Sequence, residues 1–228
     1  MWRGIERGLE WLLEFVAPSC CGACGDPSRA LFCPACGTPP DATLESLSGG
    51  VPLIAAGPYV SPLKEAIGRF KYGSCPELAT RLSQLLLPKL GDLGLVRGDA
   101  FVPVPLHRAR LVERGYDQSA LLARALARAH GARFLPRLLS RDKETAQQAT
   151  LDRRARADNV CGAFRVRQAW GSGRVVLVDD VVTTGATVRA CFGALAEAGV
   201  TVLAVAAIAR AGSAILHQNG GDTAVGLG

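Results

Sequence analysis

The segment from Arg174 to Thr187 constrains the fold of this chain more than any other part of the sequence. It begins with RVVLVD, a run of Val and Leu closed by Asp179, and a second acid, Asp180, comes next. A continuous apolar run of this kind is typical of a strand buried on both faces of a parallel sheet. A short Thr- and Gly-rich loop follows, and residues 186–199 have the pattern of a helix that ends at a glycine. The sequence therefore predicts a strand, a loop and a helix, with polar groups at the carboxyl edge of a sheet, where ligands of such sheets bind.

The loop after the two acids has the composition of a phosphate site. Backbone N–H groups and hydroxyls at a helix N-terminus surround an anion that the helix dipole also favours. The neighbouring carboxylates would repel a lone phosphate, so they need partners of their own, such as ribose hydroxyls or Mg²⁺. A phosphate, a ribose and a magnesium-bound pyrophosphate together describe phosphoribosyl pyrophosphate (PRPP). We predict a PRPP site, with Mg²⁺ held by the two acids, formed by Asp179, Asp180, Thr183, Thr184, Gly185, Ala186 and Thr187.

Strand and helix patterns alternate through the second part of the chain. Extended patterns cover residues 51–60, 101–106, 174–179 and 200–209. Helical patterns cover residues 62–71, 76–88, 119–130 and 186–199. Strand, helix and strand at this spacing predict parallel pairing through right-handed crossovers. The expected fold class is therefore α/β with a parallel sheet.

Four cysteines in two matched turns predict a structural zinc site. Cys21 and Cys24 form one Cys-x-x-Cys-Gly turn, and Cys33 and Cys36 form the other. Two thiolates at this spacing bind one face of a tetrahedral ion, and two such turns close its coordination sphere. A redox pair or a disulfide hairpin would explain two of these cysteines but not four. Cys20 is an alternative ligand, although only Cys21 gives the matched spacing.

The domain organisation follows from these patterns. Apolar residues at helical spacing predict an amphipathic helix over 2–16, either a packing helix or a membrane-surface helix. A turn-rich stretch from Gly37 to Gly50 predicts a linker. The expected units are an N-terminal helix and zinc ribbon over 1–45, an α/β domain over 50–212 and a disordered tail over 213–228. The zinc unit either holds the N-terminal helix or binds a partner or nucleic acid.

Composition excludes several classes of protein. The chain is 49% hydrophobic and 20% charged, so it can bury a core. Its cysteines cluster instead of spreading as in secreted disulfide domains. Charged residues interrupt the N-terminal apolar stretch, and no apolar run is long enough to span a bilayer, so we expect a cytoplasmic protein. The net charge of +6 comes mainly from arginine, which favours nucleotides or nucleic acid as partners or serves solubility alone.

The segment VVLVDDVVTTGAT, residues 175–187, resembles the thirteen-residue signature of type I phosphoribosyltransferases at every position. The resemblance implies a Rossmann-like phosphoribosyltransferase domain. In it, Asp179 and Asp180 hold the ribose 2- and 3-hydroxyls, directly or with the metal, and residues 183–187 hold the 5-phosphate. Purine-salvage members carry an Asp where Thr183 stands, so the loop argues against hypoxanthine–guanine salvage.

The same resemblance implies a pyrophosphate loop and a lid. Fixed cations after the first core strand would stabilise the charge of a departing pyrophosphate. Residues 141–164 would form a flexible lid that excludes water, although an Arg-rich loop also suits a single-stranded nucleic acid backbone. The implied pyrophosphate and lid residues are Leu106, His107, Arg108, Arg110, Arg114 and Arg156.

The complete order of motifs resembles the ComF family of competence proteins. The two cysteine turns come first, followed by VPVPL (102–106), RGYDQ (114–118), the Gln148 to Phe164 segment and the thirteen-residue signature. Family members often have Asn where Asp117 stands. The resemblance implies a zinc ribbon joined to a phosphoribosyltransferase domain, in a protein that handles incoming single-stranded DNA during natural transformation beside DNA-uptake or DNA-loading proteins. Three functions stay open: a PRPP- and DNA-binding uptake factor, a phosphoribosyltransferase acting on a small nitrogenous acceptor, and a PRPP sensor.

Overall fold

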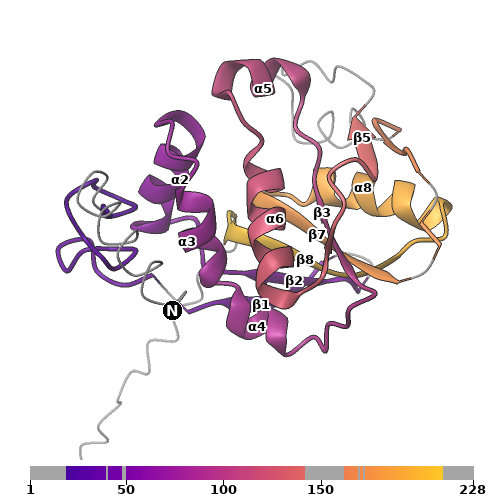
Figure 1. The fold of residues 1–228 in the computed structure, drawn as a ribbon, viewed down its shortest axis with the longest axis horizontal. Helices are drawn as coiled ribbons and strands as arrows, with labels where there is room; N and C mark the ends of the chain where they lie inside the picture. Colours follow the sequence, from indigo (N-terminus) through magenta and orange to yellow (C-terminus); the bar gives the residue numbers. More distant parts are fainter. Residues whose placement is uncertain are drawn as a thin grey trace, which may run out of the picture.

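A mostly parallel sheet of six strands forms the centre of the protein (Figure 1). The computed structural model describes residues 19–39, 41–47, 50–141, 162–168, 170–171 and 173–212. The strand order is β1-β2-β8-β7-β3-β4, and only the β1–β2 pair is antiparallel. The six strands are β1 (Thr43–Ser46), β2 (Pro52–Ala55), β3 (Ala100–Pro103), β4 (Arg133–Phe134), β7 (Arg174–Val182) and β8 (Thr201–Arg210).

Helices cover both faces of this sheet, and a small second sheet lies beside it. The helices are α2 (Leu63–Tyr72), α3 (Leu78–Gln84), α4 (Leu87–Gly91), α5 (Arg108–Arg114), α6 (Gln118–His130) and α8 (Ala186–Glu197). The second sheet pairs β5 (Leu139–Arg141) with β6 (Phe164–Val166) in antiparallel fashion. In the described part of the chain, no helix has both the length and the apolar character needed to cross a membrane.

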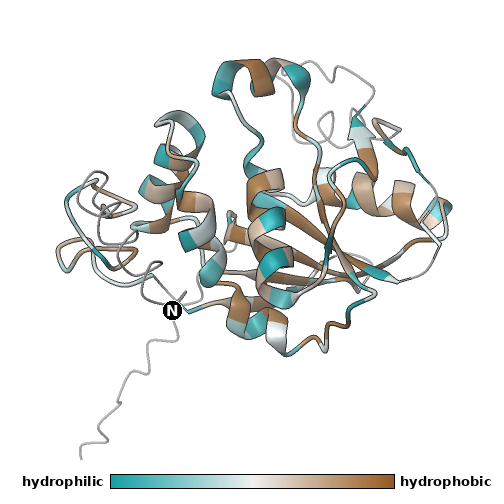
Figure 2. Ribbon diagram, in the orientation of Figure 1, coloured by the Kyte–Doolittle hydropathy of each residue, from teal (hydrophilic) through white to brown (hydrophobic). Residues whose placement is uncertain are grey.

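Strand β7 separates two hydrophobic cores. Val176 and Val178 face the core that contains the apolar sides of α2, α3 and α6. Val175 and Leu177 face the opposite core, formed with α8 and the β5–β6 sheet. Side chains alternate across a strand, so a strand buried on both faces must be apolar at every position. The middle portions of the central strands are accordingly hydrophobic, and their charged residues lie toward the strand ends (Figure 2).

The strand order places a topological switch point between β3 and β7. After β3 the chain passes through α5 and α6 to β4, on one side of β3. After β7 it passes through α8 to β8, on the other side of β7. Because the two connections leave in opposite directions, a space opens beyond the carboxyl ends of β3 and β7, and ligands of open α/β sheets bind in such a space.

The parallel sheet and the main helices confirm the predicted mixed α/β class. Several predictions about individual elements were wrong. The expected linker contains β1, the helix expected over 76–88 is divided into α3 and α4, and the extended pattern over 51–60 contains only β2. Strand β7 also runs past the acid that was expected to end it. The expected N-terminal helix, the tail and residues 142–161 of the expected lid lie outside the described residues.

An ion pair between the partly exposed Arg174 and the buried Asp99 joins β3 and β7 at the amino ends of these strands, opposite the switch point. Asp99 is 1% exposed and immediately precedes β3. Its carboxylate accepts hydrogen bonds from the guanidinium of Arg174 at 2.7 and 3.1 Å and from the N–H of Val96 at 2.9 Å. The Arg174 hydrogen bond is the main reason that the pKa of Asp99 lies below its ordinary value.

We expect Asp99→Asn to lower the free energy of unfolding at pH 7 by about 2 kcal/mol, because hydrogen bonds to a buried charge are worth about 1.5–3 kcal/mol. A depressed pKa stabilises the fold above the unfolded-state value and loses that effect as the pH falls, so the deficit should shrink toward pH 3. Denaturant unfolding at several pH values measures both effects. The exposed Asp92→Asn substitution is the control, and an equal loss in both variants would contradict this account of the ion pair.

Candidate functional site

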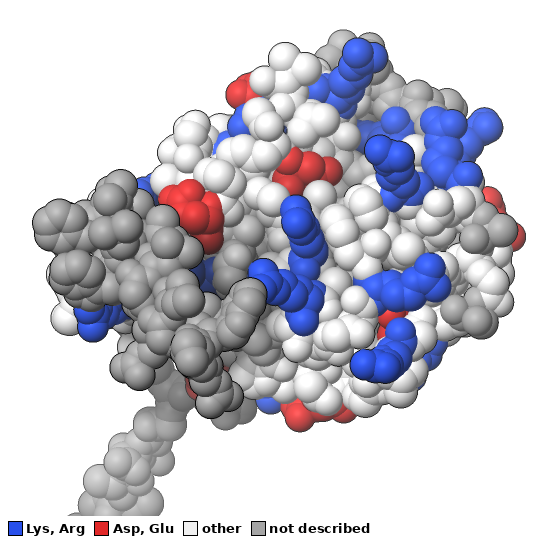
Figure 3. Space-filling view, in the orientation of Figure 1, with Lys and Arg blue, Asp and Glu red and all other residues white. Residues whose placement is uncertain are grey.

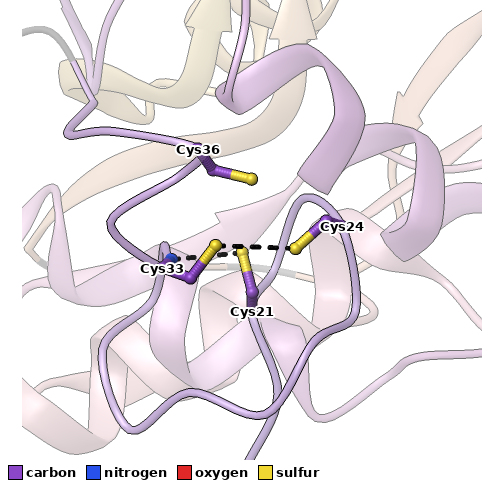
Figure 4. A group of neighbouring side chains, drawn as sticks. All are labelled: Cys21, Cys24, Cys33 and Cys36. Carbon is purple, nitrogen blue, oxygen red and sulfur yellow. Dashed lines mark hydrogen bonds between the residues drawn. The ribbon is translucent and has the colours of Figure 1, made fainter.

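The four predicted cysteines lie together in one loop, here called the cysteine loop (residues 20–36) (Figure 4). Their sulfur atoms all lie within 4.8 Å of one another, and those of Cys24 and Cys33 are 3.6 Å apart. A tetrahedral zinc ion with Zn–S bonds of about 2.3 Å requires sulfurs roughly 3.8 Å apart. The sulfur of Cys20 instead lies 3.9 Å from the guanidinium of Arg69. The donor set therefore fits a structural zinc ion held by Cys21, Cys24, Cys33 and Cys36.

The backbone of the cysteine loop is shaped around its sulfurs. The glycines that follow the second cysteine of each turn, Gly25 and Gly37, have φ values of +89° and +80°, which glycine adopts without strain. Burial alone would raise the pKa of Cys21, but N–H groups directed at its sulfur, including that of Cys33 at 3.3 Å, lower the pKa to about 6. Because zinc binds the thiolate, this backbone favours the form of Cys21 that metal binding needs.

The cysteine loop is anchored on the α/β domain by apolar and polar contacts. Cys21, Phe32 and Cys33 are buried in the same core as α2 and α3. Two arginines on these helices donate to carbonyl groups of the loop. Arg69 of α2 donates to the carbonyls of Cys21 and Gly22, and Arg81 of α3 donates to those of Cys20 and Ala30.

The two predicted acids, Asp179 and Asp180, lie on β7 where its neighbour β3 ends. The β3 ladder stops with Pro103 opposite Val178, and the chain then turns toward α5. Strand β7 continues, paired with β8, as far as Val182. Among the described strands, none pairs with residues 179–182 on the β3 side. The backbone of this acid pair is therefore held by pairing with β8, and on the side of β3 side chains from other elements can reach the two carboxylates.

Asp179 is held by hydrogen bonds to a single carboxylate oxygen. Its Oδ1 accepts from the hydroxyl of Ser119 at 3.0 Å and from the N–H of Asp180 at 2.9 Å. Burial is the main cause, and the charge of Asp180 the next, of a rise in the pKa of Asp179 to about 7. A carboxyl group with this pKa changes its charge in the physiological range.

Asp180 forms an ion pair with a lysine from another element. Its Oδ1 lies 2.9 Å from Nζ of Lys71, in the last turn of α2. The two side chains are only 16% (Lys71) and 13% (Asp180) exposed, so water screens the pair much less than an ordinary surface ion pair. The acid pair thus carries one lysine as its counter-charge.

The predicted phosphate loop leads into α8. Thr183 and Thr184 are exposed, whereas Gly185 is buried and has a φ of +74°. Gly185 is the N-cap of α8 and supplies no side-chain cap. The first N–H groups of a helix, here those of Ala186 and Thr187, have no hydrogen-bond partner within the helix. The N–H of Ala186 makes a long contact of 3.4 Å with the Thr184 hydroxyl.

The predicted pyrophosphate residues lie on and around α5. Leu106 and His107 are half-buried, and Nδ1 of His107 caps α5 by accepting from the N–H of Ala109 at 3.2 Å. Arg108 is exposed and Arg110 is partly exposed. The predicted lid residue Arg156 lies outside the described residues.

Arg114 occupies a different environment from the other predicted arginines. It is 9% exposed and donates to Oε1 of Gln118 at 3.0 Å and to the hydroxyl of Tyr72 at 3.2 Å. Its guanidinium also lies 5.0 Å from the centre of the Tyr72 ring. The RGYDQ motif therefore joins the start of α6 to the end of α2. Asp117, in the same motif, caps α6 by accepting from the N–H of Ala120 at 2.9 Å.

Sequence reasoning missed Lys71 and Ser119, which contact the acid pair directly. Ser119 directly follows the RGYDQ motif, and its position as the first residue of the predicted helix over 119–130 was the available signal. Lys71 had no such signal, because a lysine near the end of an amphipathic helix is usually a solvated residue.

Basic side chains gather on one region of the surface. Figure 3 shows Lys and Arg clustered at the upper right of the molecule, in the region of β5 and α8 in Figure 1. Burial, followed by the charge of Arg110, lowers the pKa of Arg141, so arginines of α5 and β5 lie close enough to interact. The arginines on or beside the β5–β6 sheet are Arg137, Arg141, Arg165 and Arg167.

Together these features define an α/β protein with a four-cysteine cluster and a shielded acid pair at the carboxyl edge of its sheet. No protein-family model matches the chain. It is 33% identical over 222 residues to DNA utilization protein YhgH of Escherichia coli K12, covering 89% of this chain and 97% of that protein. It is 31% identical over 198 residues to competence protein F of Haemophilus influenzae, covering 84% of each chain. Competence protein ComFC of Bacillus subtilis is 28% identical over 142 residues, 62% of this chain and 56% of that protein.

These similarities confirm the predicted relationship, and the chain belongs to the ComF family.

We expect the purified protein to contain one zinc ion per chain and to lose thermal stability when a chelator removes it, because metal binding contributes directly to the folding of such loops. Cys24→Ser should abolish stoichiometric zinc, and Cys20→Ser should retain it. Elemental analysis together with thermal unfolding measures both. Loss of zinc in Cys20→Ser but not in Cys21→Ser would assign the ligand to Cys20 instead.

We expect Asp179→Asn to raise Tm at pH 8 by on the order of a few °C, and the gain to shrink toward pH 5. An unfolded Asp titrates near ~3.9, and the pKa of native Asp179 is about 7. Between these values the native state carries the extra proton, so stability falls as the pH rises through this window. The amide keeps an acceptor for Ser119. The exposed Glu197→Gln of α8 is the control, and a Tm loss in Asp179→Asn at pH 8 would contradict the assigned pKa.

Proposed function

We propose that the chain binds PRPP with Mg²⁺ at the carboxyl end of β7 and that it acts in DNA uptake by handling single-stranded DNA. The observation that carries the PRPP proposal is the juxtaposition of the acid pair with the uncapped N-terminus of α8, only a few residues apart on the chain. The fold of the second part is, in this proposal, that of a type I phosphoribosyltransferase, and the cysteine loop is its zinc ribbon.

Each part of the proposed ligand has a chemically matched group. The hydroxyls and N–H groups of residues 183–187 would hold the 5-phosphate at the α8 N-terminus. The carboxylates of Asp179 and Asp180 would hold the ribose hydroxyls, directly or through Mg²⁺, and the bound Mg²⁺ would offset the charge of the pyrophosphate. The raised pKa of Asp179 supports this assignment, because a ligand hydroxyl or cation would stabilise the charged form that burial disfavours.

The DNA part of the proposal rests on the relatives and on the arginine distribution. The Escherichia coli relative is named a DNA utilization protein, and two others are named competence proteins. Arginines around the β5–β6 sheet match the repeated phosphates of a nucleic acid backbone. Partner proteins would be those that import or load DNA, and the site of action would be the cytoplasm.

The same acid pair also supports a second function, transfer of the phosphoribosyl group to a small nitrogenous acceptor. In that reaction the C1–O bond of PRPP breaks, pyrophosphate leaves with the electron pair, and the acceptor nitrogen bonds to C1 and releases a proton. The exposed Thr183 supplies no carboxylate base for that proton. A panel of bases, amines and nucleic acids assayed for pyrophosphate release tests this function, and absence of release across the panel rules it out.

We expect a labelled single-stranded oligonucleotide to bind the protein and its affinity to change when Mg²⁺ and PRPP are added, because α8, whose N-terminus belongs to the proposed ligand site, packs in the same core as the β5–β6 sheet that carries the arginines. Fluorescence anisotropy measures the affinity at a fixed low salt concentration, since backbone contacts weaken steeply with salt.

The double variant Asp179→Asn/Asp180→Asn should still bind DNA but lose its response to PRPP, and Glu197→Gln should behave as the unaltered protein. An affinity that PRPP changes equally in the double variant would place the ligand elsewhere. Absence of DNA binding with retained stabilisation by PRPP would exclude direct DNA contact and leave the PRPP site intact.

A further inference from the structure

Four consecutive residues at the end of α2 contact four different parts of the molecule. Successive residues of an α-helix point about 100° apart, so chain neighbours face different sides. Phe70 is buried in the core, and the Tyr72 hydroxyl accepts a hydrogen bond from Arg114. Arg69 reaches the cysteine loop, and Lys71 reaches the acid pair. One helical turn therefore connects the two functional features that the sequence predicted separately.

Arg69 is the polar link between this turn and the cysteine loop. Its Nη1 donates to the carbonyl of Cys21 at 2.5 Å and lies 3.3 Å from that of Gly22. Gly25 packs against the guanidinium so closely that a Cβ atom there would lie 3.3 Å from Cζ. The loop carbonyls thus hold a rigid, planar group, whose position changes if the loop changes shape.

Lys71 is two residues further along and points into the candidate site. Its ammonium group is paired with Asp180 at 2.9 Å, and both side chains are largely shielded from water. A ligand that engages Asp180 must approach within contact distance of this ammonium group. An anionic ligand would be attracted to Lys71, whereas a bare cation would compete with it for Asp180.

We propose that Lys71 is a ligand-binding residue of the candidate site, which contacts the anionic part of the bound molecule, and that the cysteine loop sets its position through Arg69. The inference rests on the proposed PRPP site and gives the cysteine loop a role in it. Phe70 anchors the turn between the two residues, with its carbonyl accepting from the Tyr116 hydroxyl. The turn is therefore held on both sides, and a displacement at Arg69 is carried to Lys71 through a single helical segment.

The chain offers a matched control for the positioning role. Arg81 of α3 donates to carbonyls of the same cysteine loop, including that of Cys20, but α3 carries no residue of the candidate site. Arg69→Gln and Arg81→Gln therefore each remove one guanidinium from the loop, and only the first loosens the helix that bears Lys71. Lys64→Met, on the exposed side of α2, is the control for the charge removed by Lys71→Met.

The first experiment needs no ligand. The coupling between Lys71 and Asp180 is measured as the non-additivity of Tm shifts in Lys71→Met, Asp180→Asn and the double variant. The same cycle is then repeated in the Arg69→Gln and Arg81→Gln backgrounds. We expect the coupling to disappear with Arg69→Gln and to persist with Arg81→Gln. The conservative Arg69→Lys substitution keeps the charge but not the planar guanidinium, so this variant should retain part of the coupling between Lys71 and Asp180. An undiminished coupling in Arg69→Gln would overturn the positioning role.

The second experiment measures Mg²⁺–PRPP binding by calorimetry. Lys71→Met and Arg69→Gln should each weaken binding by about ten- to a hundredfold, as expected for loss of one charged hydrogen bond. Arg69→Gln should add nothing further in the Lys71→Met background, whereas Lys64→Met and Arg81→Gln should leave the affinity unchanged. Unaltered affinity in Lys71→Met would overturn the ligand-binding role. If the unaltered protein binds no PRPP, the proposed function and this ligand role both fail, and the Tm cycle still decides whether Arg69 positions Lys71.

Discussion

The candidate site depends on two adjacent carboxylates, Asp179 and Asp180, that are shielded from water at the carboxyl end of a parallel strand. Removal of a charge from water is costly unless other groups replace the lost solvation. Here the replacements come from separate elements: Lys71 from α2, Ser119 from α6 and the N–H of Asp180 from β7 itself. These groups compensate the acid pair only in part, because burial and the charge of Asp180 still raise the pKa of Asp179 to about 7. A ligand that supplied a hydroxyl or a cation to Asp179 would offset this remaining desolvation cost, and the offset would add to its binding free energy.

The elements that supply these compensating groups are themselves held by the RGYDQ motif and by the cysteine loop. The RGYDQ motif fixes the start of α6 through the Asp117 cap and joins it to α2 through Arg114. The cysteine loop fixes α2 and α3 through Arg69 and Arg81. The cysteine loop is thus attached to the sheet domain by direct hydrogen bonds from α2 and α3. Its metal would contribute to the order of α2 as well as to that of its own loop.

Local patterns predicted the parts of this arrangement that depend on neighbouring residues. The apolar run from Val175 to Val178 correctly predicted a buried strand, because both faces of that strand are covered. The cysteine spacing correctly predicted that the four sulfurs lie together, because each pair of cysteines lies within one turn. The partners of the acid pair were missed because Lys71 and Asp180 are far apart in sequence and meet only through the fold. The sequence predicts a linker where β1 lies, because TLES contains a single apolar residue, Leu44, and so shows no alternating pattern. The strand forms because it pairs with β2. The length of β7 was underestimated because pairing with β8 outweighs the turn tendency of two acids.

Because β7 pairs with a strand on only one side at residues 179–182, the position of the acid pair and its charge balance are set by different elements. The ladder to β8 holds the backbone of residues 179–182, whereas the charge balance of the carboxylates is set by side chains from α2 and α6. A substitution on either helix can therefore change which ligand the acids prefer without moving the acids themselves. In evolutionary terms, the strand can be inherited unchanged while two helices diverge. The same strand can thereby carry an acid pair of different charge balance through a few replacements on α2 and α6.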